Sequence, residues 1–132
     1  MTQIHAHWLQ QHNRRVRLRH AWRAFFADWD ILLCPTTATT AFAHDHQKFG
    51  RRTVDVNGAV QPHFQQLFWA GLITGPYLPS TVFPSGVSQQ GLPIGIQAIG
   101  SELCDYTTID FTRLLGARWV VSRHRVASLS CK

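Results

Sequence analysis

The chain of 132 residues is long enough for one ordinary domain and too short for two. Its content of 45% hydrophobic and 15% charged residues excludes a disordered chain, because disorder requires low hydrophobicity and high net charge. The formal net charge of +6 invites a nucleic-acid partner, but the basic residues come with no zinc-finger spacing or aromatic RNA-binding motif, so none is expected.

The first predicted element is a long amphipathic helix over residues 4 to 29. Its apolar side chains recur at helical spacing along one stripe, which is interrupted by Gln11 and Arg15. The basic side chains between residues 12 and 23 scatter around the helix axis, which favours a solvated basic helix over a phosphate-binding face. The apolar stripe consists of Ile4, Trp8, Leu18, Trp22, Phe25, Phe26 and Trp29.

No segment of the sequence predicts a signal peptide or a membrane span. The N-terminal stretch MTQIHAHWLQQHNRR has no apolar core, and no run approaches the roughly 20 apolar residues of a spanning helix. The cysteines Cys34, Cys104 and Cys131 lie far apart and form no Cys-x-x-Cys motif, so a disulfide framework is not expected. For the sequence as given, we expect a reduced, cytoplasmic protein without a membrane partner.

A short apolar strand follows in the stretch DILLCP and is stopped by Pro35. Residues 36 to 52 are polar and rich in alanine, threonine and histidine, which predicts a long loop. Within this loop His44 and His46 flank Asp45 and could hold a metal ion. Two imidazoles alone rarely make a site, and no third ligand follows at a recognisable spacing. A solvent-facing polar loop is therefore favoured, and no metal site is predicted.

The central part of the chain predicts a hairpin followed by a helix. The dipeptide Asn57-Gly58 lies between β-type residues in RRTVDVNGAVQPHF, which is a strong hairpin signal. The stretch PHFQQLFWAGLITG then shows a helical apolar face, with Pro62 in its first turn and Gly75-Pro76 at its end.

Two strands and a last helix complete the predicted order. The apolar stretches YLPSTVFPSG and GLPIGIQAIG are strand candidates joined by the polar turn VSQQ. The second has no charged residue, which is typical of a strand covered on both faces, and its Gln97 would need a hydrogen-bond partner. Asp105 can cap a helix over residues 106 to 118, whose apolar residues spread around its circumference and predict burial on several sides. The order is that of an α/β chain with too few strands to enclose its own central strand.

The nucleophilic and titratable residues do not by themselves form a convincing active site. Ser85 and Ser88 lie near glycine but lack the Gly-x-Ser-x-Gly elbow, so a strand-ending turn is favoured. The sequence has one glutamate, Glu102, and two lysines, Lys48 and Lys132, neither in the apolar context that a lysine base requires. No phosphate-binding glycine loop is present, and no cofactor is predicted.

The succession of these motifs resembles the C-terminal portion of amidase-signature enzymes. The stretch NRRVRLRHAWRAFFADWDILLCPTTATTAFAHDH is similar to the family's long helix, proline-ended strand and Thr/Ala-rich loop, and VDVNGAVQPHFQQLFWAGLITG resembles its hairpin and following helix. The stretch YLPSTVFPSGVSQQGLPIGIQAIGSELCDYTTIDFTRLL is similar to the family's C-terminal signature. The resemblance covers about residues 8 to 118, and the tail from Arg118 departs from the family's proline-rich ending.

The resemblance implies an α/β fold class, namely the C-terminal part of the amidase-signature fold with a mixed β-sheet flanked by helices. It implies that residues 1–132 form a single partial domain, whose central strand takes its cover and its neighbouring strands largely from sequence before Met1. Amidase-signature enzymes hydrolyse carboxamides through a serine nucleophile, a bridging serine and a neutral lysine. The matching motifs do not occur in this chain, so no catalytic residue is assigned to it.

The resemblance further implies an amide hydrolase of which this part, inactive alone, lines a portion of the substrate pocket. Phe68, Trp69 and Tyr77 are the candidate pocket residues, although core packing is favoured for each. A small-molecule amide is the expected partner of the complete enzyme, and self-association is one way to cover exposed strand edges. The NRR and HDH segments favour a stand-alone amidase over the amidotransferase subunit that works on charged tRNA.

Two alternatives of other classes stay open. A non-catalytic binding or complementing module would melt cooperatively as a monomer or homo-oligomer, whereas a fragment would aggregate, fold partially or form oligomers. A small basic nucleic-acid-binding protein would show a steeply salt-dependent affinity for single or double strands.

Overall fold

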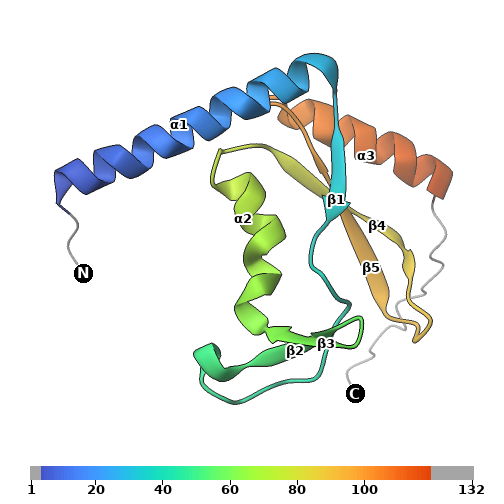
Figure 1. Ribbon diagram of the computed structural model, residues 1–132. Helices are drawn as coiled ribbons and strands as arrows, with labels where there is room; N and C mark the ends of the chain where they lie inside the picture. The colour runs from blue at the N-terminus through green and yellow to red at the C-terminus, as the bar shows by residue number, and fades with distance from the viewer. Residues whose placement is uncertain (1–3, 120–132) are drawn as a thin grey trace, which may run out of the picture.

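The computed structural model describes residues 4 to 119 (Figure 1). A long helix α1 (His5–Asp28) leads into the short strand β1 (Leu32–Pro35). Strands β4 (Ser80–Val87) and β5 (Pro93–Ile99) come later in the chain and are followed by the last helix, α3 (Asp105–Trp119). The order of helices and strands is therefore the α/β order that the sequence predicts.

The main sheet has three antiparallel strands in the order β1-β5-β4. Leu33 of β1 pairs with Ala98, and Val82 of β4 pairs with Gln97, so both neighbours of β5 come from this chain. The expectation that sequence before Met1 would largely supply these neighbours is wrong for the described residues. The physical reason is that β1 and β5 pair across a long stretch of sequence, and no local pattern reveals such a pairing.

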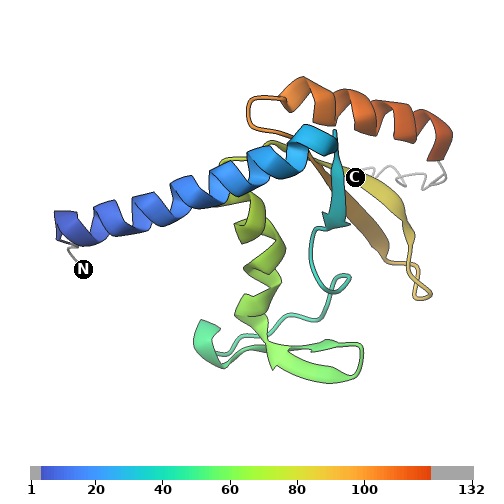
Figure 2. The same cartoon turned by 45° about the horizontal axis from the view of Figure 1, so that its top comes forward.

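Helices lie on both faces of this sheet (Figures 1 and 2). Cys34 and Ile99 point to one face and pack against Ile73 of helix α2 (Phe68–Thr74) and the end of α1. On the opposite face, the hydroxyl of Thr108 in α3 lies 2.8 Å from that of Thr81 in β4. A sheet flanked by helices confirms the predicted fold class, and every strand pairing among residues 4 to 119 is antiparallel.

Gln97 joins the three strands of the sheet through a buried hydrogen-bond network. Its side chain is only 4% exposed. The Nε2 group donates to the carbonyl oxygen of Pro35 at 2.8 Å and to Sγ of Cys34 at 3.1 Å, and Oε1 accepts from Oγ of Ser80 at 3.3 Å. The expected partner for a buried glutamine is thus confirmed, because a buried amide without one would be costly.

Two cysteines lie within the described residues, and both are free thiols. Burial raises the pKa of the Cys34 thiol, because it disfavours the thiolate, and the hydrogen bond from Gln97 offsets part of this rise. Cys104 is exposed, and Cys131 lies outside the described residues.

Helix α1 confirms the long N-terminal helix, but its apolar stripe is not a continuous buried face. The first half of the helix projects beyond the rest of the molecule (Figure 1), and Trp8 there is 47% exposed. Near the middle of the helix, the guanidinium groups of Arg15 and Arg19 lie over the ring of Tyr77, at 4.8 and 5.7 Å from its centroid. The interpretation of a wholly solvated basic helix is therefore wrong for these two arginines.

Glu102 ties α1 to the loop that precedes α3. Its carboxylate accepts hydrogen bonds from Arg19 and, at 2.9 Å, from Nη2 of Arg23. We expect Glu102→Ala to lower the free energy of unfolding by about 1 kcal/mol in low salt, since both arginines are partly exposed and screened. Urea unfolding should show this loss, and amide hydrogen exchange should speed up in the second half of α1.

The matched control for this prediction is a second ion pair that is open to solvent. Arg113 and Asp110 of α3 lie 3.2 Å apart, with side chains 73% and 62% exposed. Asp110→Ala should change the stability by no more than a few tenths of a kcal/mol. Equal losses from the two substitutions, or a loss from Glu102→Ala that high salt leaves unchanged, would contradict the role given to Glu102.

A two-stranded hairpin follows β1 and its loop. Strands β2 (Thr53–Val56) and β3 (Ala59–Pro62) pair antiparallel, as the sequence predicts. Asn57 and Gly58 have φ angles of 55° and 83°, the left-handed backbone that a two-residue hairpin turn requires.

The helix predicted after the hairpin is divided in two. A 3-10 turn, η2 (His63–Leu67), comes first and α2 (Phe68–Thr74) continues from it. Pro62 ends β3 instead of occupying the first helical turn, because it pairs with Thr53 across the hairpin. A further 3-10 turn, η1 (Phe49–Arg51), interrupts the predicted loop.

Helix α3 confirms the last predicted helix, with Asp105 as its first residue and not its cap. Thr108 and Thr112 face the sheet and are buried, whereas Ile109 and Leu114 are 49% and 63% exposed. The prediction of burial on several sides is wrong within the described residues, because no element of this part of the chain lies over the outer side of α3. No helix among residues 4 to 119 combines the length and apolar character needed to cross a membrane.

Candidate functional site

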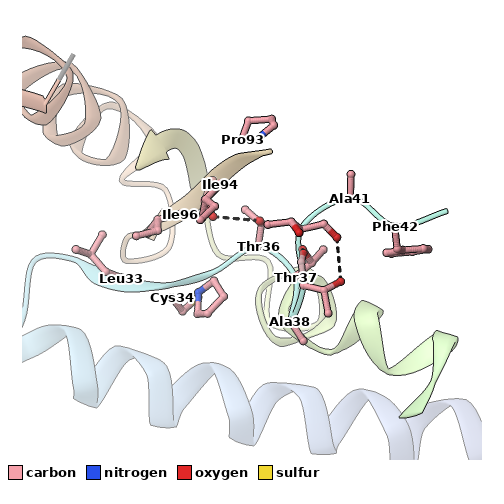
Figure 3. A pocket seen from close by; sticks show the side chains of 14 residues that line it. Leu33, Cys34, Thr36, Thr37, Ala38, Ala41, Phe42, Pro93, Ile94 and Ile96 are labelled. Carbon is pink, nitrogen blue, oxygen red and sulfur yellow. Dashed lines mark hydrogen bonds between the residues drawn. The ribbon is translucent and has the colours of Figure 1, made fainter. Parts of the chain in front are cut away.

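A cavity lies where β1 ends and β5 begins. It has a volume of about 730 Å³ and is lined by Leu33, Ile94 and Ile96 of the sheet and by the loop from 36 to 42 (Figure 3). The loop is held to the sheet by Thr36, whose Oγ1 donates to the carbonyl oxygen of Gly95 at 3.3 Å. The lining of this cavity is mainly apolar, and its polar groups are mostly threonine hydroxyls.

A second cavity adjoins the same loop, because Ala38 lines both. Its volume is about 640 Å³, and its walls come from β3, η2 and α2. The loop is fixed here by Gln66, whose Oε1 accepts the Ala38 backbone N–H at 3.1 Å and which is 8% exposed. The lining residues are Ala38, Gln61, Phe64, Gln65, Leu67, Phe68 and Trp69.

The structure brings together two of the three predicted pocket residues. Phe68 and Trp69 line the second cavity, with their rings edge to face and centroids 5.2 Å apart. Trp69 also packs against the core around Ile99, whereas Phe68 is 62% exposed. Tyr77 lies elsewhere, beneath α1, with a positive φ of 63°.

Sequence reasoning missed most of the lining of both cavities. The Thr/Ala-rich loop after Pro35 was expected only as a polar loop, and Phe64 and Leu67 only as a helix face. One feature of the sequence could have predicted part of the second cavity's lining, namely the apolar residues Phe64, Leu67 and Phe68 around a helix start. Their spacing resembles an ordinary buried face, but all three are more than half exposed.

The side chains lining the cavities offer apolar contact, the hydroxyl groups of threonines and the amides of Gln61 and Gln65, not an activated nucleophile. Cys34 lines the larger cavity, but its raised pKa keeps the thiol in its less reactive protonated form. Oγ of Ser85 donates to the carbonyl oxygen of Ile94 at 3.2 Å, and Oγ of Ser88 accepts the Gln90 and Leu92 backbone N–H groups. These two serines therefore fix a turn, as the sequence favoured.

The histidine-rich loop does not form a metal cluster in the described part of the chain. The rings of His44 and His46 stack with centroids 6.3 Å apart. No group of three or more histidine, cysteine or acidic side chains comes together among residues 4 to 119. Lys132, the second lysine, lies outside these residues.

The comparisons with known proteins identify the family of this fold. The family model described as Amidase matches residues 1–109, which is most of the chain. The chain belongs to the amidase family. The resemblance noted in the sequence is thereby confirmed.

Among curated relatives, the chain is 35% identical over 102 residues to the A subunit of the glutamyl-tRNA(Gln) amidotransferase of Cyanothece sp., covering 74% of this chain and 18% of that protein. The protein of the same description from Acaryochloris marina is 34% identical with the same shares covered. These relatives belong to amidotransferases, so they give no support to the preference for a stand-alone amidase.

One solved structure gives the same fold within a larger chain. It is described as "An unexpected vestigial protein complex reveals the evolutionary origins of an s-triazine catabolic enzyme". The TM-score is 0.73 at 25% identity, and the match covers 88% of this chain and 25% of that one. The chain thus spans about a fifth to a quarter of the proteins that it matches.

Proposed function

We propose that residues 1–132 are a partial amidase domain, the C-terminal segment of a hydrolase that cleaves the C–N bond of carboxamides. The observation that carries this proposal is the pair of mainly apolar cavities that share Ala38, in a chain of the amidase family. Apolar walls with few polar groups are typical of small-molecule sites. This segment supplies walls for the substrate, and the catalytic residues come from outside it.

The chemistry of amide cleavage explains why the segment is inactive alone. An amide carbon needs an activated nucleophile, a base that takes its proton and donors that stabilise the oxyanion. The cavity linings contain no lysine and no carboxylate, and Ser85 and Ser88 are engaged in a turn. The free state of Cys34 and Cys104 is compatible with the reduced cytoplasmic setting that we propose.

We expect the purified chain to release no ammonia above background from acetamide or benzamide. The physical reason is that neither cavity holds a nucleophile and base in hydrogen-bond contact. A coupled ammonia assay at neutral pH, with Ser85→Ala and Ser88→Ala variants beside the unaltered chain, measures this directly. Turnover that either serine substitution abolishes would overturn the proposal.

A non-catalytic module is the alternative that the same preparation tests. Such a module would bind a carboxamide without turnover. Benzamide-dependent quenching of the tryptophan fluorescence that is lost in both Trp69→Phe and Phe68→Ala would report that binding, since the chain has five tryptophans. A nucleic-acid-binding role is less favoured, because Arg15, Arg19 and Arg23 contact Tyr77 or Glu102.

A further inference from the structure

The two cavities that share Ala38 have uncharged walls. Among the described residues that line them, none is an arginine, a lysine, an aspartate or a glutamate. The larger cavity presents mostly aliphatic side chains and threonine hydroxyls, and the second presents aromatic rings and two amides. A charged group that leaves water for such a wall finds no opposite charge to pair with, and this costs free energy. The walls therefore favour a neutral ligand over an anion or a cation.

The second cavity has a wall of aromatic rings. The rings of Phe68 and Trp69 meet edge to face, with an interplanar angle of 79° and centroids 5.2 Å apart. Phe64 lines the same cavity, and the side chains of Phe64 and Phe68 are 55% and 62% exposed, so a ligand can reach their rings. Trp69 is held from behind, because it packs against the core around Ile99. Since aromatic rings attract one another beyond simple apolar contact, this wall favours a ligand that is itself aromatic.

Two glutamine amides belong to the lining of the second cavity. Gln61 comes from β3, where it pairs with Val54 across the hairpin, and Gln65 comes from η2. Each primary amide offers two N–H donors and a carbonyl acceptor, which complement the acceptor and the donors of a carboxamide. A ligand that has both a ring and a carboxamide can therefore use the aromatic wall and the glutamine amides together.

We propose that the second cavity selects a neutral aromatic carboxamide, whose ring lies against Phe68 and Trp69 and whose amide group meets Gln61 and Gln65. This inference rests on the proposed function, because it takes the cavity as a wall of the substrate site, and it names the class of amide that this wall accepts. The same wall disfavours an amide that carries charges, such as L-glutamine with its ammonium and carboxylate groups. The discrimination is strong, since a charge left unpaired in an apolar site costs more than a lost apolar contact.

Ligand titrations of the intact chain of 132 residues, followed by NMR, test this selection. The side-chain N–H signals of Trp69, Gln61 and Gln65 in isotope-labelled protein report binding at the cavity. Benzamide should shift these signals with a millimolar or tighter dissociation constant. Benzoate has the same ring and nearly the same shape but is an anion, so it should bind at least about tenfold more weakly, as should L-glutamine. Equal binding of benzamide and either charged ligand, or no shift of the Trp69 signal by benzamide, would overturn the proposal.

Two neutral analogues separate the contribution of the ring from that of the amide. Cyclohexanecarboxamide keeps the amide and lacks the aromatic ring, whereas acetophenone keeps the ring and lacks the amide N–H groups. Each should bind at least about threefold more weakly than benzamide, because each loses one of the two kinds of contact. Cyclohexanecarboxamide bound as tightly as benzamide would overturn the aromatic class and leave the proposed function standing. Acetophenone bound as tightly as benzamide would contradict a carboxamide site, and with it both the inference and the proposed function.

Two matched substitutions connect the selection to this cavity. Phe68→Leu keeps an apolar side chain and removes the ring, so it should remove most of the preference for benzamide over cyclohexanecarboxamide. Phe68 is 62% exposed, so the fold should remain intact by circular dichroism. Tyr106→Leu removes an aromatic ring on α3, where Tyr106 is 83% exposed and lines neither cavity, and it should leave the preference unchanged. A preference that Phe68→Leu leaves intact, or that Tyr106→Leu removes, would overturn the assignment to this cavity.

Ammonia release from the same samples reports on the proposed function separately. Selective binding of benzamide without turnover supports both the inference and the proposed function. Hydrolysis of benzamide that Ser85→Ala or Ser88→Ala abolishes would contradict the proposed function, whereas the order of the ligand affinities would still support the inferred ligand class.

Discussion

Ile99→Ala should lower the free energy of unfolding by about 2–5 kcal/mol, the range for removing a large aliphatic side chain from a core. Ile99 is fully buried at the end of β5, where it packs with Cys34 and Ile73. Phe26 and Leu72 close the same cluster, so the substitution leaves a cavity between the sheet and two helices. Urea unfolding followed by tryptophan fluorescence measures the loss.

Two further variants serve as controls for the loss expected from Ile99→Ala. Ile99→Val should cost about 0.5–1.5 kcal/mol, because it removes a single methyl group. Ile94→Ala, on the same strand but 37% exposed, should cost less than Ile99→Ala because a smaller area leaves water. An Ile99→Ala loss no greater than that of Ile94→Ala would show that the cluster around Ile99 is not the core of the folded chain.

Gly100→Ala should destabilise the protein by about 1–3 kcal/mol through overpacking. A Cβ atom at this position would lie 2.8 Å from Cγ2 of Thr108. Thr108 cannot turn away freely, because it is 1% exposed and its hydroxyl bonds to Thr81 and to the Asp105 carbonyl oxygen. The added methyl group therefore pushes α3 away from the sheet.

A double-mutant cycle tests this steric cause. Thr108→Ser removes the Cγ2 atom and keeps the hydroxyl, so adding it to Gly100→Ala should restore part of the lost stability. Gly116→Ala in α3 is the matched control, since open space surrounds that position and alanine favours a helix. Losses from Gly100→Ala and Thr108→Ser that simply add would contradict the contact between α3 and the end of β5.

The candidate site could be predicted from the sequence only in part. Phe68 and Tyr77 show why. Both are aromatic and close in sequence, and the pattern offers no ground for separating them. In the structure, α2 carries Phe68 toward the loop at Ala38, and the turn after it carries Tyr77 under Arg15. Which aromatic side chain lines a cavity depends on the direction of the chain between them.

Features that depend on residues close together in the sequence could be predicted from the sequence alone. The Asn57-Gly58 turn, the extent of α1 and the buried strand around Gln97 follow from local backbone preference and apolar spacing. The folded arrangement was needed to place β1 beside β5, to turn Arg19 inward to Glu102, and to leave Leu67 and Phe68 exposed. These features depend on contacts between segments far apart in the chain, and such contacts leave no periodic trace in the sequence.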